Sequence, residues 1–162
     1  MDKSTLKPAH LRRIKSLALL NDEQLTAFLE YVKVMECTIS GTLFQEGQPG
    51  DSMYLILEGQ MRVYTKQKNG EVVFLRLLNA GDAFGEIALL NHAVRSASVE
   101  AVQRSVLLTI SSAALQQIIA EQPPLAAQFL YHLARSLGRQ LGDLTTKLRA
   151  QREYGEVLSF LQ

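Results

Sequence analysis

Four glycines at near-regular intervals constrain the fold of this chain more than any other feature of its sequence. Gly50, Gly59, Gly70 and Gly81 lie 9, 11 and 11 residues apart, and short runs of β-branched, aromatic and aliphatic residues separate them. Each interval fits one strand with its turn, since about 8 to 12 residues are usual for that unit in an antiparallel sandwich or barrel. The sequence therefore predicts an antiparallel, jelly-roll-like β-roll that begins near Val34.

Two runs within this region alternate between apolar side chains and others. Over residues 61–65 and 106–110 the alternation has a period of two, which is typical of half-buried strands. Lys68, Asn69 and Gly70 follow the first run, and Asn-Gly can supply the positive φ angles of a tight hairpin turn. We therefore expect a β-hairpin around this turn.

The residues before the predicted β-roll have the apolar periodicity of a helix. Apolar residues recur at intervals of three to four over residues 17–32, and Asn21 or Asp22 can cap a helix that begins near Glu23. Short helices on the N-terminal side of the β-roll and a long one after it would make the chain mainly β with flanking helices, an α+β fold.

The C-terminal part of the chain returns to the helical period. One helix is expected after Ser111, and Pro123 and Pro124 end it and can begin a second, longer one. In that second helix one heptad position holds Leu130, Leu137, Leu144 and Leu158, and the other holds Ala134, Leu141 and Leu148. This pattern favours a two-helix dimer seam, with a single amphipathic helix folded back on the β-roll as the alternative.

The segment between Phe84 and Val99 carries the strongest functional signal. Gly85 lets the backbone turn sharply, and the apolar residues that follow can form one short helix whose first amides attract an anion. Arg95, expected on the next strand, supplies a planar, permanently charged fork suited to phosphate oxygens. Glu86 would repel a phosphate at contact, so its carboxylate fits an offset position where it accepts a hydrogen bond from a sugar hydroxyl. Together these residue types indicate a sugar-phosphate ligand.

Each of these residues also has an ordinary structural explanation. Glu86 could be an acid favoured by the helix dipole, Arg95 a solvated strand residue and the apolar turn a buried connector. Those explanations give no reason for an acid and an arginine to flank one apolar helical turn, nine residues apart, within a β-roll bracketed by helices.

At these residues the sequence resembles the cyclic-nucleotide-binding domain family, which includes catabolite-activator-type regulators, cyclic-nucleotide-dependent kinases and gated channels. Residues 84–101 resemble the phosphate-binding cassette of the family, and residues 50–59 and 79–82 match its turn and strand motifs in order. The resemblance implies that Arg95 binds the cyclic phosphate and that Glu86 binds the ribose 2′-hydroxyl. The other ligand-binding residues that it implies are Gly85, Ile87, Ala88, Ser96 and Ala97.

The resemblance also bears on the base and on the cassette loop. It implies that the long C-terminal helix covers the base, with possible base contacts at Leu75, Arg76, Arg139, Gln140 and Thr145. Val94 stands where many relatives carry proline, which implies altered loop dynamics and retained binding. Ser96 stands where relatives specific for cGMP often carry threonine; serine is compatible with either base, and we expect cAMP to be preferred over cGMP.

Composition and the scatter of reactive residues argue against several other functions. With 17 basic and 16 acidic residues, the formal charge of +1 gives no overall field to draw the chain onto nucleic acid or anionic lipid. His10, His92 and His132 are too scattered for the metal centre of a cupin-like enzyme, and Cys37 lies in a β-like run where a buried, inert thiol is usual. We expect no catalysis, no metal, no cofactor, no direct contact with nucleic acid and no contact with a membrane.

The resemblance implies a cyclic-nucleotide sensor. We expect it to be cytoplasmic, because residues 1–15 lack the apolar core of a signal peptide and no run is long enough to span a bilayer. We divide the chain into 1–122, the ligand-binding β-roll with its N-terminal helices and cassette, and 123–162, the long helix as lid and dimerisation segment. That helix would transmit binding to a partner or to an output domain, and the apolar repeat that runs to Leu161 indicates a longer protein. Two alternatives stay open: a dimerisation or interaction module that binds no nucleotide, and a transcription regulator cut before its DNA-binding domain.

Overall fold

Two antiparallel sheets of four strands each form the body of the protein. The computed structural model describes the backbone of residues 3–160 and the side chains of residues 3–150. The strands are β1 (Lys33–Cys37), β2 (Thr42–Phe44), β3 (Ser52–Glu58), β4 (Gln60–Lys66), β5 (Val72–Asn79), β6 (Ala83–Phe84), β7 (Ser98–Ala101) and β8 (Ser105–Ser111). The strand order is β1-β8-β3-β6 in one sheet and β2-β7-β4-β5 in the other.

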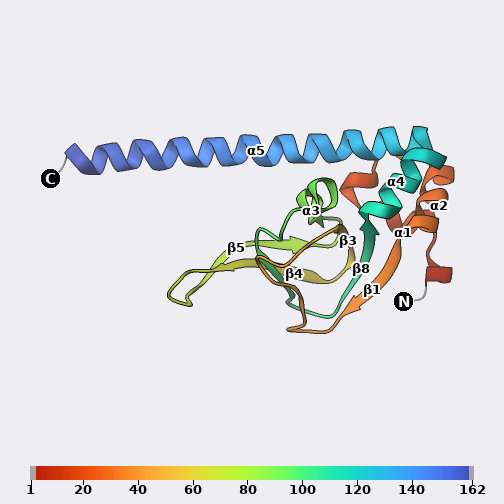
Figure 1. The fold of residues 1–162 in the computed structure, drawn as a ribbon, viewed down its shortest axis with the longest axis horizontal. Helices are drawn as coiled ribbons and strands as arrows, with labels where there is room; N and C mark the ends of the chain where they lie inside the picture. Colours follow the sequence, from red (N-terminus) through yellow and green to blue (C-terminus); the bar gives the residue numbers. More distant parts are fainter. Residues whose placement is uncertain (1–2, 161–162) are drawn as a thin grey trace.

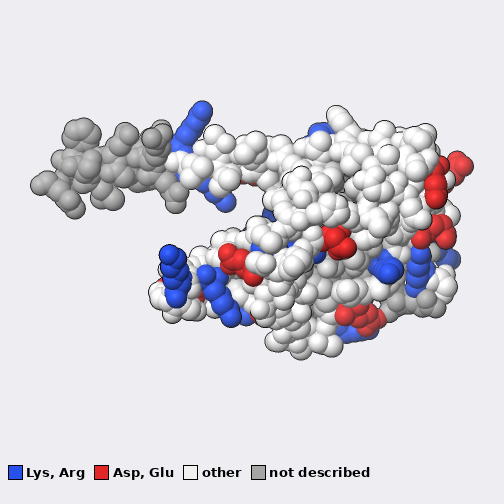
Figure 2. Space-filling model, viewed as in Figure 1, with Lys and Arg blue, Asp and Glu red and all other residues white. Residues whose placement is uncertain are grey.

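Helices flank the two sheets, so the predicted α+β fold with an antiparallel β-roll is confirmed. They are η1 (Lys3–Thr5), α1 (Pro8–Leu11), η2 (Lys15–Leu17), α2 (Asp22–Tyr31), α3 (Glu86–Asn91), α4 (Ser112–Glu121) and α5 (Pro123–Phe160). Figure 1 shows the N-terminal helices and α4 gathered at one end of the sheets, with α5 running along one side and beyond them. Figure 2 shows a hollow between the projecting part of α5 and the hairpin of β4 and β5.

The start of α2 follows from its capping residues. The Asn21 side chain accepts a hydrogen bond from the Gln24 amide at 2.8 Å, and the Gln24 side chain accepts one from the Asn21 amide at 3.0 Å. This reciprocal pair satisfies two amides that the helix leaves unpaired. Asn21 is therefore the cap, and the helix begins at Asp22, one residue before the predicted start.

The hairpin between β4 and β5 is present, but its predicted turn geometry was wrong. Only Gly70 has a positive φ, of 85°, whereas Asn69 does not. The Gly70 amide donates to the Gln67 carbonyl and the Gln67 amide to the Glu71 carbonyl, both at 2.9 Å, which defines a three-residue loop. The Asn69 side chain instead accepts a hydrogen bond from the Glu71 amide at 2.9 Å, a local turn that needs no left-handed asparagine.

The strand β8 is buried on both faces, which the prediction of a half-buried strand over residues 106–110 missed. It lies between β1 and β3 in the first sheet. Val106 and Leu108 belong to a core cluster shared with the helices, whereas Leu107 belongs to a second cluster that includes residues of both sheets. A period of two cannot distinguish one buried face from two when both kinds of position hold apolar residues.

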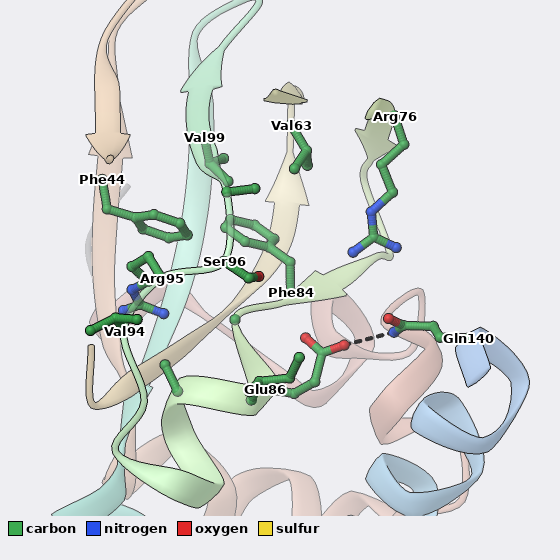
Figure 3. A pocket seen from close by; sticks show the side chains of 14 residues that line it. Phe44, Val63, Arg76, Phe84, Glu86, Val94, Arg95, Ser96, Val99 and Gln140 are labelled. Atoms are coloured by element: carbon green, nitrogen blue, oxygen red, sulfur yellow. Dashed lines mark hydrogen bonds between the residues drawn. The ribbon is translucent and has the colours of Figure 1, made fainter. Parts of the chain in front are cut away.

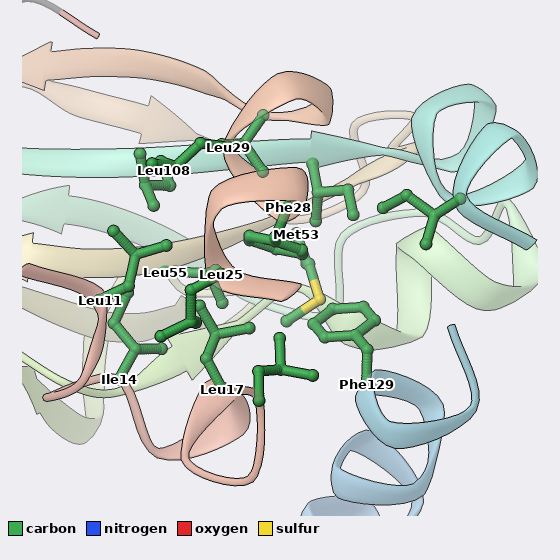
Figure 4. Packing of buried hydrophobic residues seen from close by; sticks show 14 of the residues in the cluster. Leu11, Ile14, Leu17, Leu25, Phe28, Leu29, Met53, Leu55, Leu108 and Phe129 are labelled. Atoms are coloured by element: carbon green, nitrogen blue, oxygen red, sulfur yellow. The ribbon is translucent and has the colours of Figure 1, made fainter. Parts of the chain in front are cut away.

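The first turns of α5 belong to the hydrophobic core. Leu125, Phe129 and Leu133 are buried in the cluster that also holds residues of α2, β3 and β8. The ring centroids of Phe129 and Phe28 lie 5.4 Å apart, and Met53 packs beside them (Figure 4). The N-terminal part of α5 is therefore fixed on the β-roll by burial of apolar side chains.

Further along, α5 presents apolar side chains to solvent. Leu141 is 65% exposed, and Leu144 and Leu148 are each 53% exposed. We call these three residues the α5 stripe; they follow the heptad pattern predicted from the sequence, whereas Leu158 and Leu161 lie outside the residues whose side chains are described. No helix in the described part of the chain is both long and apolar enough to cross a membrane.

Candidate functional site

The turn from β6 into α3 requires glycine. Gly85 has a φ of 83°, in the left-handed region, and the six-residue helix α3 begins immediately after it. A Cβ at this position would lie 2.9 Å from the Nη1 atom of Arg95 and 3.1 Å from the Ser52 carbonyl oxygen. Both the backbone conformation and the space therefore favour glycine, and the missing side chain leaves room for the guanidinium.

Arg95 is buried, and no carboxylate among the described side chains neutralises it. Its side chain is only 6% exposed, and Nη1 donates a hydrogen bond to the Ser52 carbonyl at 2.7 Å. The guanidinium carbon lies 4.2 Å from the ring centroid of Phe44 and 5.4 Å from that of Tyr54. Its Nε is buried with no hydrogen-bond partner, and no carboxylate among residues 3–150 forms a salt bridge with it. A buried cation in this state is costly unless an anion joins it.

Burial raises the pKa of the Tyr54 phenol, although the nearby Arg95 charge acts in the opposite direction. Because the net shift is upward from an ordinary value of 10.0, the phenol stays neutral near pH 7. Tyr54 and Phe44 thus offer Arg95 ring faces, which attract a cation without cancelling its charge.

A loop before β3 holds the backbone of Arg95 in place. The Arg95 amide donates to the Gln48 carbonyl, and the Gly47 amide donates to the Arg95 carbonyl, both at 2.8 Å. A Cβ at Gly50 would lie 2.6 Å from Arg95 Nε, so the guanidinium passes directly over this glycine. The prediction that Arg95 lies on a strand was wrong: β7 begins only at Ser98, and Arg95 belongs to the loop before it.

Glu86 is the second charged residue of the site. It is only 5% exposed, and its Oε1 accepts a hydrogen bond from Nε2 of Gln140 at 2.6 Å (Figure 3). A carboxylate only accepts hydrogen bonds, so the amide nitrogen of Gln140 must face it and the amide oxygen must point elsewhere. Because Gln140 lies on α5, this bond joins the first residue of α3 to the long helix.

These residues surround one pocket (Figure 3). Its cavity volume is about 110 Å³, and part of it is open to solvent. The structure brings all the predicted cassette residues to its wall: Gly85, Glu86, Ile87, Ala88, Arg95, Ser96 and Ala97.

The possible base contacts divide into two groups. Arg76 and Gln140 line the pocket with the cassette. Arg139 instead lines a second cavity, Leu75 is half-exposed on β5 and lines neither, and the Thr145 hydroxyl donates to a carbonyl of its own helix.

Several pocket residues were not predicted from the sequence. Phe44, Val63 and Val99 form apolar wall, and Tyr54 supports the guanidinium of Arg95. They come from four different strands and reach the pocket only through pairing of the sheets, so no local motif marks them. Gly50 was interpreted from the sequence only as a turn residue, whereas the structure shows Arg95 packed directly over it.

The fold and this site together define a β-roll domain with an internal pocket lined by a buried arginine and a buried glutamate. The family model for the cyclic nucleotide-binding domain matches residues 40–122, about half of the chain. The chain therefore belongs to the cyclic nucleotide-binding domain family. The domain that this family model describes is a binding domain.

Known regulators are similar to this chain in sequence. The "CRP-like cAMP-activated global transcriptional regulator" of Mycobacterium tuberculosis is 30% identical over 103 residues, which cover 64% of this chain and 46% of the regulator. The "Cyclic AMP receptor protein" of Thermus thermophilus is 32% identical over 106 residues, which cover 65% of this chain and 47% of that protein. The matched part thus spans about half the length of these relatives.

Solved structures of similar proteins share the fold. The catabolite activator protein of Thermus thermophilus superposes with a TM-score of 0.75 and 29% identity, covering 83% of this chain and 61% of that one. The N-terminal domain of a transcriptional regulator from Streptomyces coelicolor A3(2) gives a TM-score of 0.73 and 29% identity, covering 84% of this chain and 94% of that domain.

Proposed function

We propose that this chain is a cyclic-nucleotide sensor that binds its ligand between the cassette and the β-roll. One observation carries the proposal: Arg95 is buried at the pocket wall with a free Nε and no carboxylate partner in the described chain. A cyclic phosphodiester carries a single negative charge, which matches one guanidinium. Arg95 would hold that phosphate with the amides of Gly85, Ile87, Ala88 and Ser96, and Glu86 would accept the ribose 2′-hydroxyl.

The proposed preference is for cAMP over cGMP. Two of the relatives described above carry cAMP in their names, and a regulatory domain of the Toxoplasma gondii kinase PKA was crystallised with cAMP. That domain superposes with a TM-score of 0.61 at 27% identity, covering 72% of this chain and 44% of that one.

Calorimetric titration of the full chain with cAMP and with cGMP tests both the site and the preference. The absence of heat and of thermal stabilisation with either ligand at millimolar concentration would refute the sensor function.

The bond between Glu86 and Gln140 provides a route from ligand to α5. The side-chain amide of Gln140 donates to one oxygen of the carboxylate that the sugar would use. We propose that the 2′-hydroxyl competes with Gln140 for Glu86, so that binding shifts the position of α5. The helix would then pass the change to a partner or to an output domain, since a ligand shifts an equilibrium only through contacts that differ between two states.

The competition predicts an unusual gain of affinity. Gln140→Ala should bind cAMP about three- to tenfold more tightly, because the buried carboxylate then depends on the ligand for a hydrogen bond. The affinity for 2′-deoxy-cAMP should change much less, since this ligand lacks the competing hydroxyl. Titration calorimetry gives both constants, and Thr146→Ala is a matched control because its hydroxyl bonds only to the Gly142 carbonyl of α5, at 3.0 Å. Weaker cAMP binding in Gln140→Ala would contradict the competition.

We also propose that the chain forms a homodimer through α5. The α5 stripe leaves large apolar side chains exposed at heptad spacing, which favours pairing with a second copy of the helix.

We also propose a cytoplasmic location. The single cysteine is buried, burial raises the pKa of its thiol, and the fold requires no oxidising compartment.

The dimer has its own test in sedimentation velocity. The double variant Leu141→Gln/Leu148→Gln should sediment as a monomer with an unchanged circular dichroism spectrum, because both side chains lie on the open stripe. Ile39→Gln should leave the dimer intact, although Ile39 is also a large exposed apolar residue, at 67%. A wild-type chain that is monomeric at tens of micromolar would contradict the proposed seam.

A further inference from the structure

A second cavity lies under α5 beside the nucleotide pocket. Its walls come from η2, from β5 and the turn that follows, and from α5. Arg76 and Gln140 line both cavities and therefore stand between them. The volume of the second cavity is about 270 Å³, part of it open to solvent, which leaves room for a small anion such as phosphate.

Two buried polar atoms line this cavity without a partner. Ser16 is only 7% exposed, and neither its Oγ nor the Nε2 of His132 has a hydrogen-bond partner within the described residues. Buried polar atoms in native proteins nearly always have one, so an orphan at a cavity wall indicates an occupant such as water or a ligand. Ser16 comes from η2 and His132 from α5, so the occupant would bridge the two elements.

The charges at the cavity favour an anion. Lys15 is paired with Asp82, at 2.6 Å between Nζ and Oδ1, and these charges cancel. Arg76 and Arg139 form no salt bridge with any described residue, and Asp143 is the one other carboxylate of the lining. Arg76 and Arg139, both exposed to solvent, thus face one carboxylate that has no salt bridge among the described residues. Burial and the charges of Arg135 and Arg139 lower the pKa of His132, in keeping with a positive local potential.

We propose that this cavity is an accessory oxyanion site, distinct from the nucleotide pocket, for a small phosphate or carboxylate compound. Arg76 and Arg139 would supply the charge, and Ser16 Oγ and His132 Nε2 would donate hydrogen bonds to its oxygens. A neutral occupant could satisfy the serine and the histidine, but only an anion would also pair with the two exposed guanidinium groups at the rim. Since the walls belong to η2, β5 and α5, a bound anion would hold α5 against the β-roll.

The site is tested by thermal unfolding of the full chain in inorganic phosphate, in succinate and in sodium chloride of equal ionic strength. About 10 mM of a ligand that binds with a millimolar Kd should raise the Tm by roughly 3 °C above the chloride control. Ser16→Ala and Arg139→Gln should lose the rise. Arg62→Gln should keep it, because Arg62 is paired with Glu100 and does not line the cavity.

The nucleotide pocket also attracts anions, so the design must separate the two sites. The rise should persist in Arg95→Ala, which removes the charge of the nucleotide pocket whether or not cAMP binds there and changes no residue that lines the second cavity. A rise that disappears in Arg95→Ala but survives in Arg139→Gln would place the anion in the nucleotide pocket and overturn the proposal. A rise with succinate alone or with phosphate alone would assign the ligand class, and no rise with either would overturn the proposal.

A second readout is the titration of His132 by NMR. A bound anion next to the imidazole favours its charged form, so the pKa of His132 should increase when the active anion is added. The signals of His10 and His92 should not follow, because neither residue lines the cavity. A Tm rise with an unchanged His132 titration would place the anion elsewhere and contradict the assignment.

Discussion

Replacing Arg95 with leucine is expected to weaken cAMP binding by about thirtyfold or more. Removal of one partner of a buried, hydrogen-bonded charge pair generally costs about 2 to 5 kcal/mol, and about 1.4 kcal/mol corresponds to a factor of ten in Kd. Leucine keeps the apolar contact with Phe44 and Tyr54, so the change removes mainly the charge and the donors. The measurement is titration calorimetry at one fixed salt concentration.

The fold of the Arg95→Leu variant should survive the change. The native guanidinium has no carboxylate partner among the side chains described, so its loss leaves no acid unpaired. Arg62→Leu is a suitable control, because Arg62 is a surface arginine paired with Glu100 at 2.7 Å and does not line the pocket. If Arg95→Leu folds normally and binds cAMP within about threefold of the wild type, the phosphate is not held by Arg95.

Phe129→Ala is expected to lower the free energy of unfolding by about 3 to 5 kcal/mol, the usual cost of removing a buried phenylalanine ring. Phe129 is completely buried, and its ring packs on Phe28 between α5 and the β-roll. Urea denaturation followed by circular dichroism measures the change. Because this ring fixes the start of α5, the variant should also allow the remainder of the helix to separate more readily from the sheets.

The matched control for Phe129→Ala lies on the same helix. Leu144 is 53% exposed, so Leu144→Ala should change the free energy of unfolding by less than about 0.5 kcal/mol, measured at a protein concentration where the chain is monomeric. Similar effects of the two substitutions would contradict the division of α5 into a buried start and a projecting remainder.

The features that the sequence predicted well are local ones. The Asn21 cap, the proline break before α5 and the glycine turn into α3 depend on residues within a few positions of one another. The cassette was identifiable for the same reason, because an acid, an apolar turn and an arginine lie within ten residues. The hairpin was also located, but the choice between two turn types depended on how one asparagine side chain bonded.

The features that could not be predicted from the sequence depend on contacts between residues far apart in the chain. The loop position of Arg95 depends on hydrogen bonds between its backbone and residues 47 and 48. That no described carboxylate pairs with it depends on the side chains that distant parts of the chain place around it. The contact of Glu86 with Gln140 joins residues 54 positions apart, and no spacing rule predicts it. Burial of β8 on both faces depends on a second sheet and on the helices, so alternation alone could not reveal it.

The central claim is that the Arg95 guanidinium holds the phosphate of a cyclic nucleotide, and a crystal structure of the chain with cAMP tests it directly. The phosphate oxygens should lie within about 2.7 to 3.0 Å of the guanidinium nitrogens, and the 2′-hydroxyl should donate to Glu86 in place of Gln140. Nucleotide density elsewhere, or an Arg95 side chain turned away from the phosphate into solvent, would contradict the claim.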